Sequence, residues 1–432
     1  MTGQQSLIAR TALGIVVGGI SSITCFATFP DKLSRSSFDR WVNVIFVTSR
    51  LSIYACIFLV FRIAPRGDVF GAYWVEAKSV LNHLLPYRDF ASSYAPLHPY
   101  LDALILRVWF SPLAIILFAI CIEALILPLW LSIGRTFLAE KEVRLSALLY
   151  VTSAISVQFV AIDGQDNVVI GALLVLALGL IYRSRIFASG AAIGLGVAAV
   201  KFLPLLYVPA FLTVTPRRLQ WTAGVFVIIL IVYGAFLALH LPVLTPLLIE
   251  STMRSSGNLP YLVEAVSGIT FPAIVWNSLV FLVCGLIILL IASKSKGAGL
   301  LLRLRTLTFG FAALTLALVL FSKKSWPPYL MMCLFPLGLL IKRENKLSIV
   351  GFSLFQVVAV VTLSFWSTIL HQNNAREFHL GLLAHEPSYF LLLGLQIALV
   401  VCYWLLHNLS LDNIRHARLP AELVSQSELV SP

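Results

Sequence analysis

Long apolar runs separated by short polar connections recur along this chain from end to end. An α-helix of about 20 apolar residues is long enough to cross about 30 Å of hydrocarbon. A β-barrel would alternate apolar and polar residues instead, so we expect an all-α, polytopic helical bundle. The pattern predicts about 13 hydrophobic segments, at 11–29, 43–63, 113–136, 145–161, 168–183, 188–200, 203–213, 219–240, 272–293, 303–321, 328–341, 347–370 and 388–406.

Three of the predicted segments need comment. The segments 188–200 and 203–213 are too short to span a membrane alone, and they could form a broken, re-entrant pair. Such a break is tolerated only where protein or a cavity covers the freed backbone. The segment 11–29 is followed directly by a basic stretch and lacks a small-residue cleavage site, so we expect a retained helix rather than a signal peptide.

Composition agrees with a membrane protein. Of 432 residues, 59% are hydrophobic and only 12% are charged, against about 25% charged residues in soluble proteins. The net charge of +12 indicates membrane topology and contact with anionic lipid headgroups, because no soluble basic domain is present to bind a nucleic acid. The six cysteines all lie in apolar runs without a CxxC pair, which favours core positions over disulfides or metal ligands.

The distribution of charge predicts orientation. Lys and Arg gather in the connections near 32–40, 135–144, 183–185, 217–218, 294–305, 342–346 and 415–418. These connections should therefore be cytoplasmic, with the N-terminus outside. The other connections include the long ones, at 64–112, 241–271 and 371–387, and they carry most of the acidic residues and histidines. Any chemistry should therefore face outward.

The first long outer connection opens with Asp68, just after a predicted membrane helix. A carboxylate at the edge of a low-dielectric region has a tunable pKa, and Arg66 could hold it ionised. General-base catalysis uses such a residue. Capping of the helix that follows would explain Asp68 equally well.

An amphipathic helix should follow Asp68 on the outer membrane surface. Val69, Tyr73, Val80 and Leu84 recur about one helical turn apart, while Glu76 lies elsewhere on the helical wheel.

The stretch YRDFASSYAPLHPY, residues 87–100, is polar and aromatic. Tyr87 and Tyr94 are typical of membrane-interface anchors. The prolines of this stretch predict an ordered loop that leads into a short amphipathic helix. Arg88 and Asp89 could bind a substrate, or they could pair with each other on the surface.

The sequence DGQDN, residues 163–167, separates two apolar runs. A turn explains Gly164 and Asn167. A turn does not explain why the polar residues Asp163, Gln165 and Asp166 lie between two membrane segments. Hydrogen-bonding groups of this kind suit sugar hydroxyls.

Three lysines on the outer side are candidate phosphate ligands. Lys201 is a lone cation between two short apolar segments, where it could snorkel to the interface or hold a lipid phosphate. Lys323 and Lys324 lie on the outer side, against the enrichment of Lys and Arg on the cytoplasmic side. An aromatic lid that includes Tyr329 could cover a phosphate bound to these two lysines. A chance interfacial anchor would also explain them. If one phosphate is shared, the three lysines should converge.

Other site types find no support in the sequence. There is no Walker loop, GxSxG, HExxH or metal-type Cys/His spacing, and there is no internal repeat of the kind found in transporters. His371, His379 and His385 should be solvated. We therefore expect no metal and no cofactor.

Taken in order, these stretches resemble the GT-C class of integral-membrane glycosyltransferases, and most closely the bacterial polyprenyl-phosphate-mannose-dependent mannosyltransferases. PYRDF…YAPL resembles the Tyr/Pro loop of that family, and GQDN resembles its GQ-N block. GAAIGLGVAAVKFLPLLYVP resembles its K-x-x-P block, and KKSWPPYLMMCLFP resembles its late aromatic-Tyr-Pro block. The resemblance covers roughly 43–345. The chain departs from the family in Pro328 before Tyr329, where Gln is common, and in the helix at 11–29.

The resemblance implies an inverting transferase at the outer face of a bacterial plasma membrane. It would move a mannose-like sugar from a polyprenyl-phosphate donor to a lipid-linked or cell-envelope (glycan) acceptor, without a metal. Asp68 matches the acidic residue that is commonly the catalytic base of the family. The candidate donor-phosphate ligands are Lys201, Lys323, Lys324 and Tyr329, and the candidate sugar or acceptor ligands are Arg88, Asp89, Tyr94, Gln165 and Asn167.

Two further expectations complete the sequence-based hypothesis. The chain should divide into an extra helix and loop (1–42), a catalytic membrane core (43–345) with the outer loop 64–112, C-terminal membrane helices (346–406) and a polar, partly disordered tail (407–432). The main alternative function is a transporter or flippase of lipid-linked sugars, which would need the cations but no base. A structural subunit of an envelope complex is a third alternative.

Overall fold

The computed structural model describes residues 3–27, 29–253, 255–372 and 388–420, and these residues form helices and no strand. The first half contains α1 (Gly3–Phe26), α2 (Phe29–Lys32), α3 (Arg35–Tyr54), η1 (Ala55–Val60), η2 (Val69–Tyr73), α4 (Trp74–Leu81), α5 (His98–Val108), α6 (Pro112–Gly134), α7 (Glu140–Val151), α8 (Ala154–Ser156), η3 (Val157–Ile162), α9 (Asn167–Tyr182), α10 (Ile186–Ala199) and η4 (Leu203–Tyr207). The second half contains α11 (Val208–Val214), α12 (Arg218–Ala238), α13 (Thr245–Thr252), α14 (Leu259–Ser267), α15 (Ala273–Ser295), α16 (Leu300–Phe321), η5 (Pro327–Cys333), α17 (Leu334–Gly338), α18 (Lys346–Gln372) and α19 (Ser388–Arg415).

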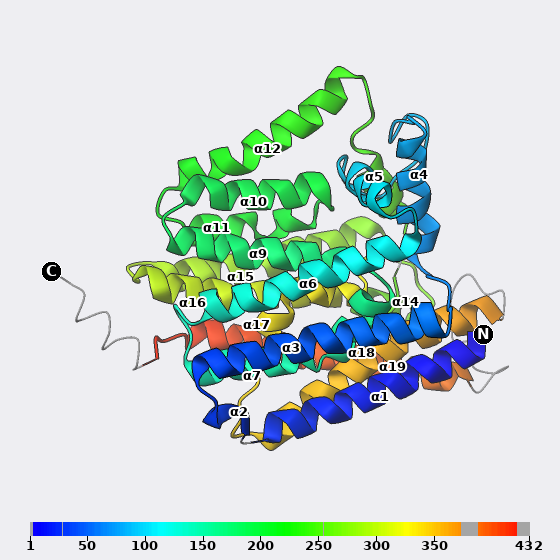
Figure 1. Cartoon of the computed structure of the whole chain (residues 1–432). Coiled ribbons are helices and arrows are strands. Elements are labelled where there is room, and N and C mark those ends of the chain that lie inside the picture. The colour runs from blue at the N-terminus through cyan, green and yellow to red at the C-terminus, as the bar shows by residue number, and fades with distance from the viewer. Residues whose placement is uncertain (1–2, 28, 254, 373–387, 421–432) are drawn as a thin grey trace.

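The long helices lie side by side as one bundle, and the short helices α4 and α5 sit together at one end of it (Figure 1). We call this the site end. The Lys- and Arg-rich connections lie at the opposite end, where Arg305 pairs with Glu142 at 2.6 Å and Arg343 pairs with Asp31. In the sequence, the distribution of Lys and Arg divided the connections into two sets. In the described structure, these two sets lie at opposite ends of the bundle.

Eight helices of the described chain are long and apolar enough to cross a membrane, or up to nine if the bent pair Glu140–Val151 and Ala154–Ile162 counts as one span. This confirms a helical, multi-pass membrane protein. The expected 13 spans are not confirmed, because α9, α10 and the η4–α11 unit are shorter apolar helices. The expected segment 328–341 folds as η5 and α17, since prolines at 327, 328 and 336 remove backbone donors and stop a long helix.

The expected break between 188–200 and 203–213 is present, at residues 200–202 between α10 and η4. Helix α10 packs closely on α12 through glycines. A Cβ on Gly190 would lie 2.0 Å from the carbonyl oxygen of Trp221, and one on Gly224 would lie 2.1 Å from that of Phe187. Small residues allow this close backbone approach between membrane helices, and the approach fixes where the break places Lys201.

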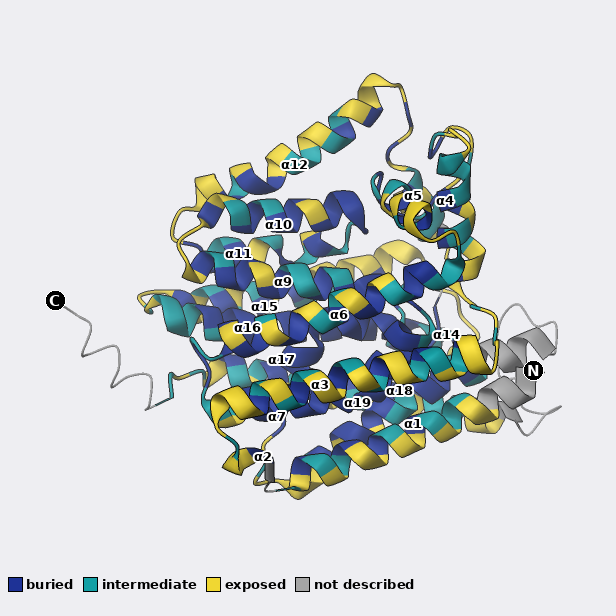
Figure 2. Cartoon of the chain, in the orientation of Figure 1, coloured by how far each residue is buried: buried dark blue, intermediate teal, exposed yellow. Residues whose placement is uncertain are grey.

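Apolar side chains cover much of the outer surface of the bundle. Figure 2 shows exposed residues along the outward faces of α1, α3 and α12, while η5, α17 and α16 are largely buried. Ile23 on α1 is 72% exposed and Phe281 on α15 is 78% exposed. A surface of this kind suits lipid contact rather than water.

One charged pair is enclosed within the bundle. Arg50 donates to Ser156 Oγ at 2.7 Å, and its Nε lies 3.7 Å from Glu123 Oε2. Tyr150 donates to Glu123 Oε1 at 2.9 Å. Ionisable groups inside a membrane bundle are tolerated when they are paired in this way. These contacts tie α3 to α6 and to the bent α7–α8 pair.

Two helices extend beyond the apolar segments expected from the sequence. Helix α3 begins at Arg35 instead of residue 43, since Ser34 caps it by accepting a hydrogen bond from Ser37 N. Helix α19 continues to Arg415 instead of ending at residue 406, and Ser410 and Ile414 on its last turns are buried. Residues 373–387, with His379 and His385, and residues 421–432 lie outside the described chain.

Candidate functional site

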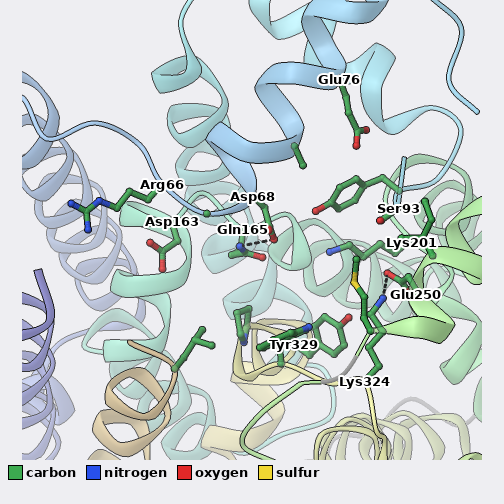
Figure 3. Close-up of a pocket in the computed structure, with 18 of the residues that line it drawn as sticks. Arg66, Asp68, Glu76, Ser93, Asp163, Gln165, Lys201, Glu250, Lys324 and Tyr329 are labelled. Carbon is green, nitrogen blue, oxygen red and sulfur yellow. Dashed lines mark hydrogen bonds and ion pairs between the residues drawn. The ribbon is translucent and has the colours of Figure 1, made fainter. Parts of the chain in front are cut away.

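A cavity of about 670 Å³ opens at the site end, between the N-terminal helix, the loop around Asp68, the turn at 163–165, α13 and the segment 324–329. Figure 3 shows Asp68 and Gln165 on one side and Lys201, Glu250 and Lys324 on the other. The charged residues that line the cavity are Arg10, Arg66, Asp68, Glu76, Asp163, Lys201, Glu250 and Lys324.

Asp68 lies in this cavity with its carboxylate oriented by an amide. Gln165 Nε2 donates to Asp68 Oδ2 at 3.0 Å. The Asp68 side chain makes no capping hydrogen bond to η2, so the structure does not favour the capping interpretation. The expected partner Arg66 points away from Asp68 (Figure 3), and no ion pair to Asp68 is present in the described part of the chain. One carboxylate oxygen is therefore left for another ligand.

The turn that presents Gln165 depends on Gly164. Its φ of +60° is a backbone conformation that favours glycine. An added Cβ would lie 2.7 Å from Val69 Cγ2 and 2.9 Å from Ile116 Cγ1. The turn therefore packs against the residue that follows Asp68, which fixes the distance between Gln165 and the carboxylate.

We expect Gly164→Ala to destabilise the protein by about 1 to 3 kcal/mol, because it adds both backbone strain and a steric clash. Gly67→Ala is the matched control, since Gly67 also has φ +60° but nothing within 4 Å of an added Cβ. Thermal unfolding in detergent micelles measures both. Equal losses for the two variants would mean that the packing of Gly164 contributes nothing.

Lys201 is held by a chain of buried polar groups. Its Nζ lies 3.0 Å from Asp166 Oδ1, and His98 Nε2 lies 3.4 Å from Asp166 Oδ2. His98 Nδ1 lies 3.4 Å from Asp102 Oδ2. The ring of Tyr94 stacks on His98 at 4.4 Å, and Lys201 Nζ sits 4.8 Å from the centroid of the same ring. The cation therefore has a fixed position at the cavity wall.

The electrostatics of this chain follow from burial and pairing. Burial alone would raise the pKa of Asp166, but Lys201 and His98 outweigh it and lower this pKa to about 2. Burial likewise disfavours the imidazolium of His98, yet Asp102 and Asp166 raise its pKa. Lys201 and His98 thus both favour the ionised form of Asp166, which in turn lies beside the positive charge of Lys201.

Of the other two lysines, only Lys324 reaches the cavity. Lys324 pairs with Glu250 there, whereas Lys323 lies 3.0 Å from Glu264 and donates to the carbonyl of Phe271 at 2.9 Å. Both residues lie in a bend between α16 and η5, and each side chain has a different carboxylate partner. The expectation that all three lysines share one site is therefore wrong for Lys323.

Tyr329 lines the cavity beside Lys201. Its ring centroid lies 6.0 Å from Lys201 Nζ, so Tyr94 and Tyr329 both present an aromatic ring to the same ammonium group. Trp326 and Pro328 also line the cavity. The expected aromatic cover over a cationic site is thus present next to Lys201 and Lys324.

Arg88 and Asp89 do not line the cavity. They pair with each other at 2.9 Å on the surface, and Asp89 also accepts from the backbone N–H of Leu85 at 2.7 Å. Of the two interpretations left open by the sequence, the structure favours the surface pair over a sugar-binding role. The reason is local: the Asp89 carboxylate closes the turn that starts at Leu85.

Tyr87 and Tyr94 are buried rather than placed as interface anchors, and Tyr87 donates its hydroxyl proton to the carbonyl of Tyr94 at 2.5 Å. Asn167 is fully buried at the start of α9 and does not line the cavity. Of the five candidate sugar ligands, Tyr94 and Gln165 therefore remain at the cavity.

Several residues of the cavity, or of the buried polar chain that holds Lys201, were missed from the sequence. Arg10 reaches Asp163 Oδ1 at 3.2 Å from the N-terminal helix, and nothing in its apolar segment indicated that contact. His98 and Asp102 were also missed, although their i, i+4 spacing places both on one face of α5. That spacing was a usable signal, because it set two polar groups on the buried side of an otherwise apolar helix.

Glu76 was expected away from the apolar face of its helix, but it is buried and accepts a hydrogen bond from Ser92 Oγ at 2.7 Å. Burial raises the pKa of Glu76 to about 7, and the bond from Ser92 only partly opposes this shift. The carboxyl group therefore keeps its proton in the folded protein at a pH where the unfolded chain releases it.

We expect the free energy of unfolding to fall as pH rises from about 4.5 to about 7, by up to about 3 kcal/mol from Glu76. Below that window the group is protonated in both states, so its contribution is fully present and no longer changes with pH. Glu76→Gln keeps an acceptor for Ser92 and should remove this part of the pH dependence. Unfolding curves at several pH values test it, with the exposed Glu344→Gln as control. Parallel pH profiles for wild type and Glu76→Gln would contradict the assignment.

The fold and the cavity define a class: a multi-pass helical membrane protein with an ionisable cavity at one end of its bundle. No protein-family model matches the chain, and no curated protein is similar to it. Among the described residues, no group of three or more His, Cys, Asp or Glu side chains could hold a metal ion. The function must therefore be inferred from the cavity itself.

Proposed function

We propose that the protein is an inverting glycosyltransferase of the GT-C type. It would move a mannose-like sugar from a polyprenyl-phosphate donor to a hydroxyl of a lipid-linked or cell-envelope acceptor. The observation that supports this most is the placement of Asp68, a carboxylate without an ion-pair partner among the described residues, across one cavity from two cations, Lys201 and Lys324. A general base and a phosphate clamp are the two parts that such a displacement needs.

In the proposed reaction the acceptor oxygen attacks the anomeric carbon of the donor sugar. Asp68 takes the proton of the acceptor hydroxyl, and Gln165 holds the carboxylate in place. The bond between the anomeric carbon and the phosphate oxygen breaks on the opposite face, and polyprenyl phosphate leaves with the electron pair. Lys201 and Lys324 stabilise the charge that develops on this leaving group.

Both lysines already have carboxylate partners, and this is compatible with phosphate binding. An ammonium group has three donors, so Lys201 can keep its bond to the buried Asp166 and still donate to a phosphate. Lys324 pairs with Glu250 on the short helix α13, so a phosphate could displace that carboxylate. We propose that Asp166 fixes the position of Lys201, while Glu250 gives up its pairing with Lys324 when the donor phosphate binds.

The neighbourhood of the cavity suits a lipid donor. Ile249 and Met253 line it, and Leu247 and Leu248 on α13 are 44% and 66% exposed. An isoprenoid chain could lie against this apolar edge while its phosphate reaches the cations. The proposal places the cavity at the outer face of a bacterial plasma membrane.

The test is donor turnover by the purified full chain in proteoliposomes. We expect radiolabelled polyprenyl-phosphate mannose to be consumed and its label to appear in an extracted glycolipid or glycan acceptor. Movement of the intact donor across the bilayer without transfer would favour the flippase alternative. Absence of both donor binding and donor consumption would remove the proposal.

The proposed orientation has its own test. We expect a membrane-impermeant thiol reagent to label Asn82→Cys in intact cells and to spare Arg217→Cys, because these exposed positions belong to opposite ends of the bundle. Labelling after membrane permeabilisation is the control for reactivity. The reverse pattern would place the cavity on the cytoplasmic side.

A further inference from the structure

A second cavity, of about 510 Å³, lies at the end of the bundle opposite the candidate active site. Four helix termini meet there: the end of α11, the start of α12, the end of α15 and the start of α16. Its polar lining residues are Thr213, Arg218, Ser295, Lys296 and Arg303. None of these residues has a part in the proposed transfer reaction.

The charge of this cavity is not compensated. Arg218, Lys296 and Arg303 line it without any carboxylate, and none of them forms an ion pair within the described part of the chain. Another groove at the same end is different, since Arg135 there binds Asp39 at 2.7 Å. The second cavity therefore has the electrostatic character of a site for an anion.

A buried hydroxyl group supports the same interpretation. Ser295 lines the cavity and is only 3% exposed, yet its Oγ has no hydrogen-bond partner among the residues that the structure describes. A buried donor without an acceptor costs free energy, so an acceptor atom supplied by a ligand would stabilise this group. An anionic oxygen in the cavity would accept from Ser295 Oγ.

Two helix N-termini add to the positive potential. Arg218 is the first residue of α12, and Arg303 lies in the first turn of α16. The free backbone N–H groups and the helix dipole favour an anion at such positions. Side-chain charge and backbone polarity thus act in the same direction on two walls of the cavity.

We propose that this cavity binds a phosphate group, carried either by an anionic lipid headgroup or by a soluble phosphate. Arginine pairs with phosphate oxygens through two parallel N–H donors, and lysine binds them as a point charge. The cavity lies where α12, α15 and α16 reach the edge of the expected hydrocarbon region, so a headgroup phosphate is within its reach.

Two binding experiments on the purified full chain distinguish the sources. In nanodiscs of phosphatidylcholine with a minor fraction of phosphatidylglycerol, native mass spectrometry counts the anionic lipids that the protein retains. In detergent, ³¹P line broadening of inorganic phosphate reports a soluble ligand. Retention of phosphatidylglycerol alone identifies a headgroup site, and phosphate binding alone identifies a soluble ligand.

The test variant is the triple change Arg218→Gln, Lys296→Gln, Arg303→Gln. We expect it to weaken the observed binding at least about 10-fold, since each basic residue near an anionic surface contributes appreciably. The matched control removes the same charge from the same end but outside the cavity, with Arg183→Gln, Arg185→Gln, Lys342→Gln. This control should bind as the wild type does.

Equal losses in both triple variants would show only general surface attraction and would overturn the proposal. Absence of binding of either probe to the wild type would also overturn it. Arg303 donates to the carbonyl of Ala298 at 2.7 Å, so the triple variant could be unstable. In that event the double change Arg218→Gln, Lys296→Gln, at two exposed positions, is compared with Arg183→Gln, Arg185→Gln.

Discussion

Asp68→Asn should fold, insert and bind the donor lipid, yet transfer sugar about 10² to 10⁴-fold more slowly than the wild type, as expected for loss of a general base. This corresponds to roughly 3 to 5 kcal/mol of transition-state stabilisation. The amide keeps the shape of the side chain and an oxygen that can accept from Gln165 Nε2, but it cannot take a proton. Single-turnover transfer of labelled sugar in proteoliposomes measures the effect.

Asp89→Asn is the control for Asp68→Asn, because Asp89 lies on the surface outside the cavity. This variant should transfer sugar at close to the wild-type rate. A near wild-type rate for Asp68→Asn would mean that another carboxylate is the base. Asp163 would then be the next candidate, since it lines the same cavity and pairs with Arg10.

Lys201→Gln should have two large effects. Because Asp166 is buried and Lys201 is its closest cation, the change should destabilise the protein by about 3 to 5 kcal/mol. It should also weaken donor binding and slow transfer by about 10² to 10³-fold, since one charge on the leaving phosphate is no longer stabilised. Thermal unfolding in detergent and donor turnover in proteoliposomes measure the two effects separately.

The double variant Lys201→Gln, Asp166→Asn separates folding from function. It removes the unpaired buried charge, so most of the lost stability should return while donor turnover stays low. Lys323→Gln is the control, because Lys323 faces Glu264 and does not line the cavity. Recovery of turnover in the double variant would show that Lys201 acts only on stability.

Much of the candidate cavity could be located from the sequence, because membrane insertion imposes strong rules on a chain. Apolar runs of sufficient length must become helices, since no other local structure satisfies the backbone within hydrocarbon. The distribution of Lys and Arg then separated the connections into two sets. Asp68, Gln165 and Lys201 belong to one set, and the structure places all three at one cavity.

Other features of the cavity had no signal of comparable strength. Lys323 and Lys324 are adjacent and chemically identical, so only the course of the bend between α16 and η5 decided which one faces the cavity. Arg88 and Asp89 have the composition of a binding pair, but the local turn at Leu85 uses the carboxylate instead.

Composition and residue order were sufficient to predict a helical membrane protein, to predict which connections share an end, and to pick out the polar residues that interrupt the apolar pattern. Those properties depend on composition and order along the chain, which hydrocarbon and charge act on directly. The folded structure was needed to show that His98 bridges Asp102 and Asp166, that Arg10 reaches the cavity, and that the 328–341 region is not a span. Those properties depend on contacts between residues far apart in the chain or on local backbone geometry. The sequence does not reveal such contacts, because packing selects one partner among several chemically equivalent ones.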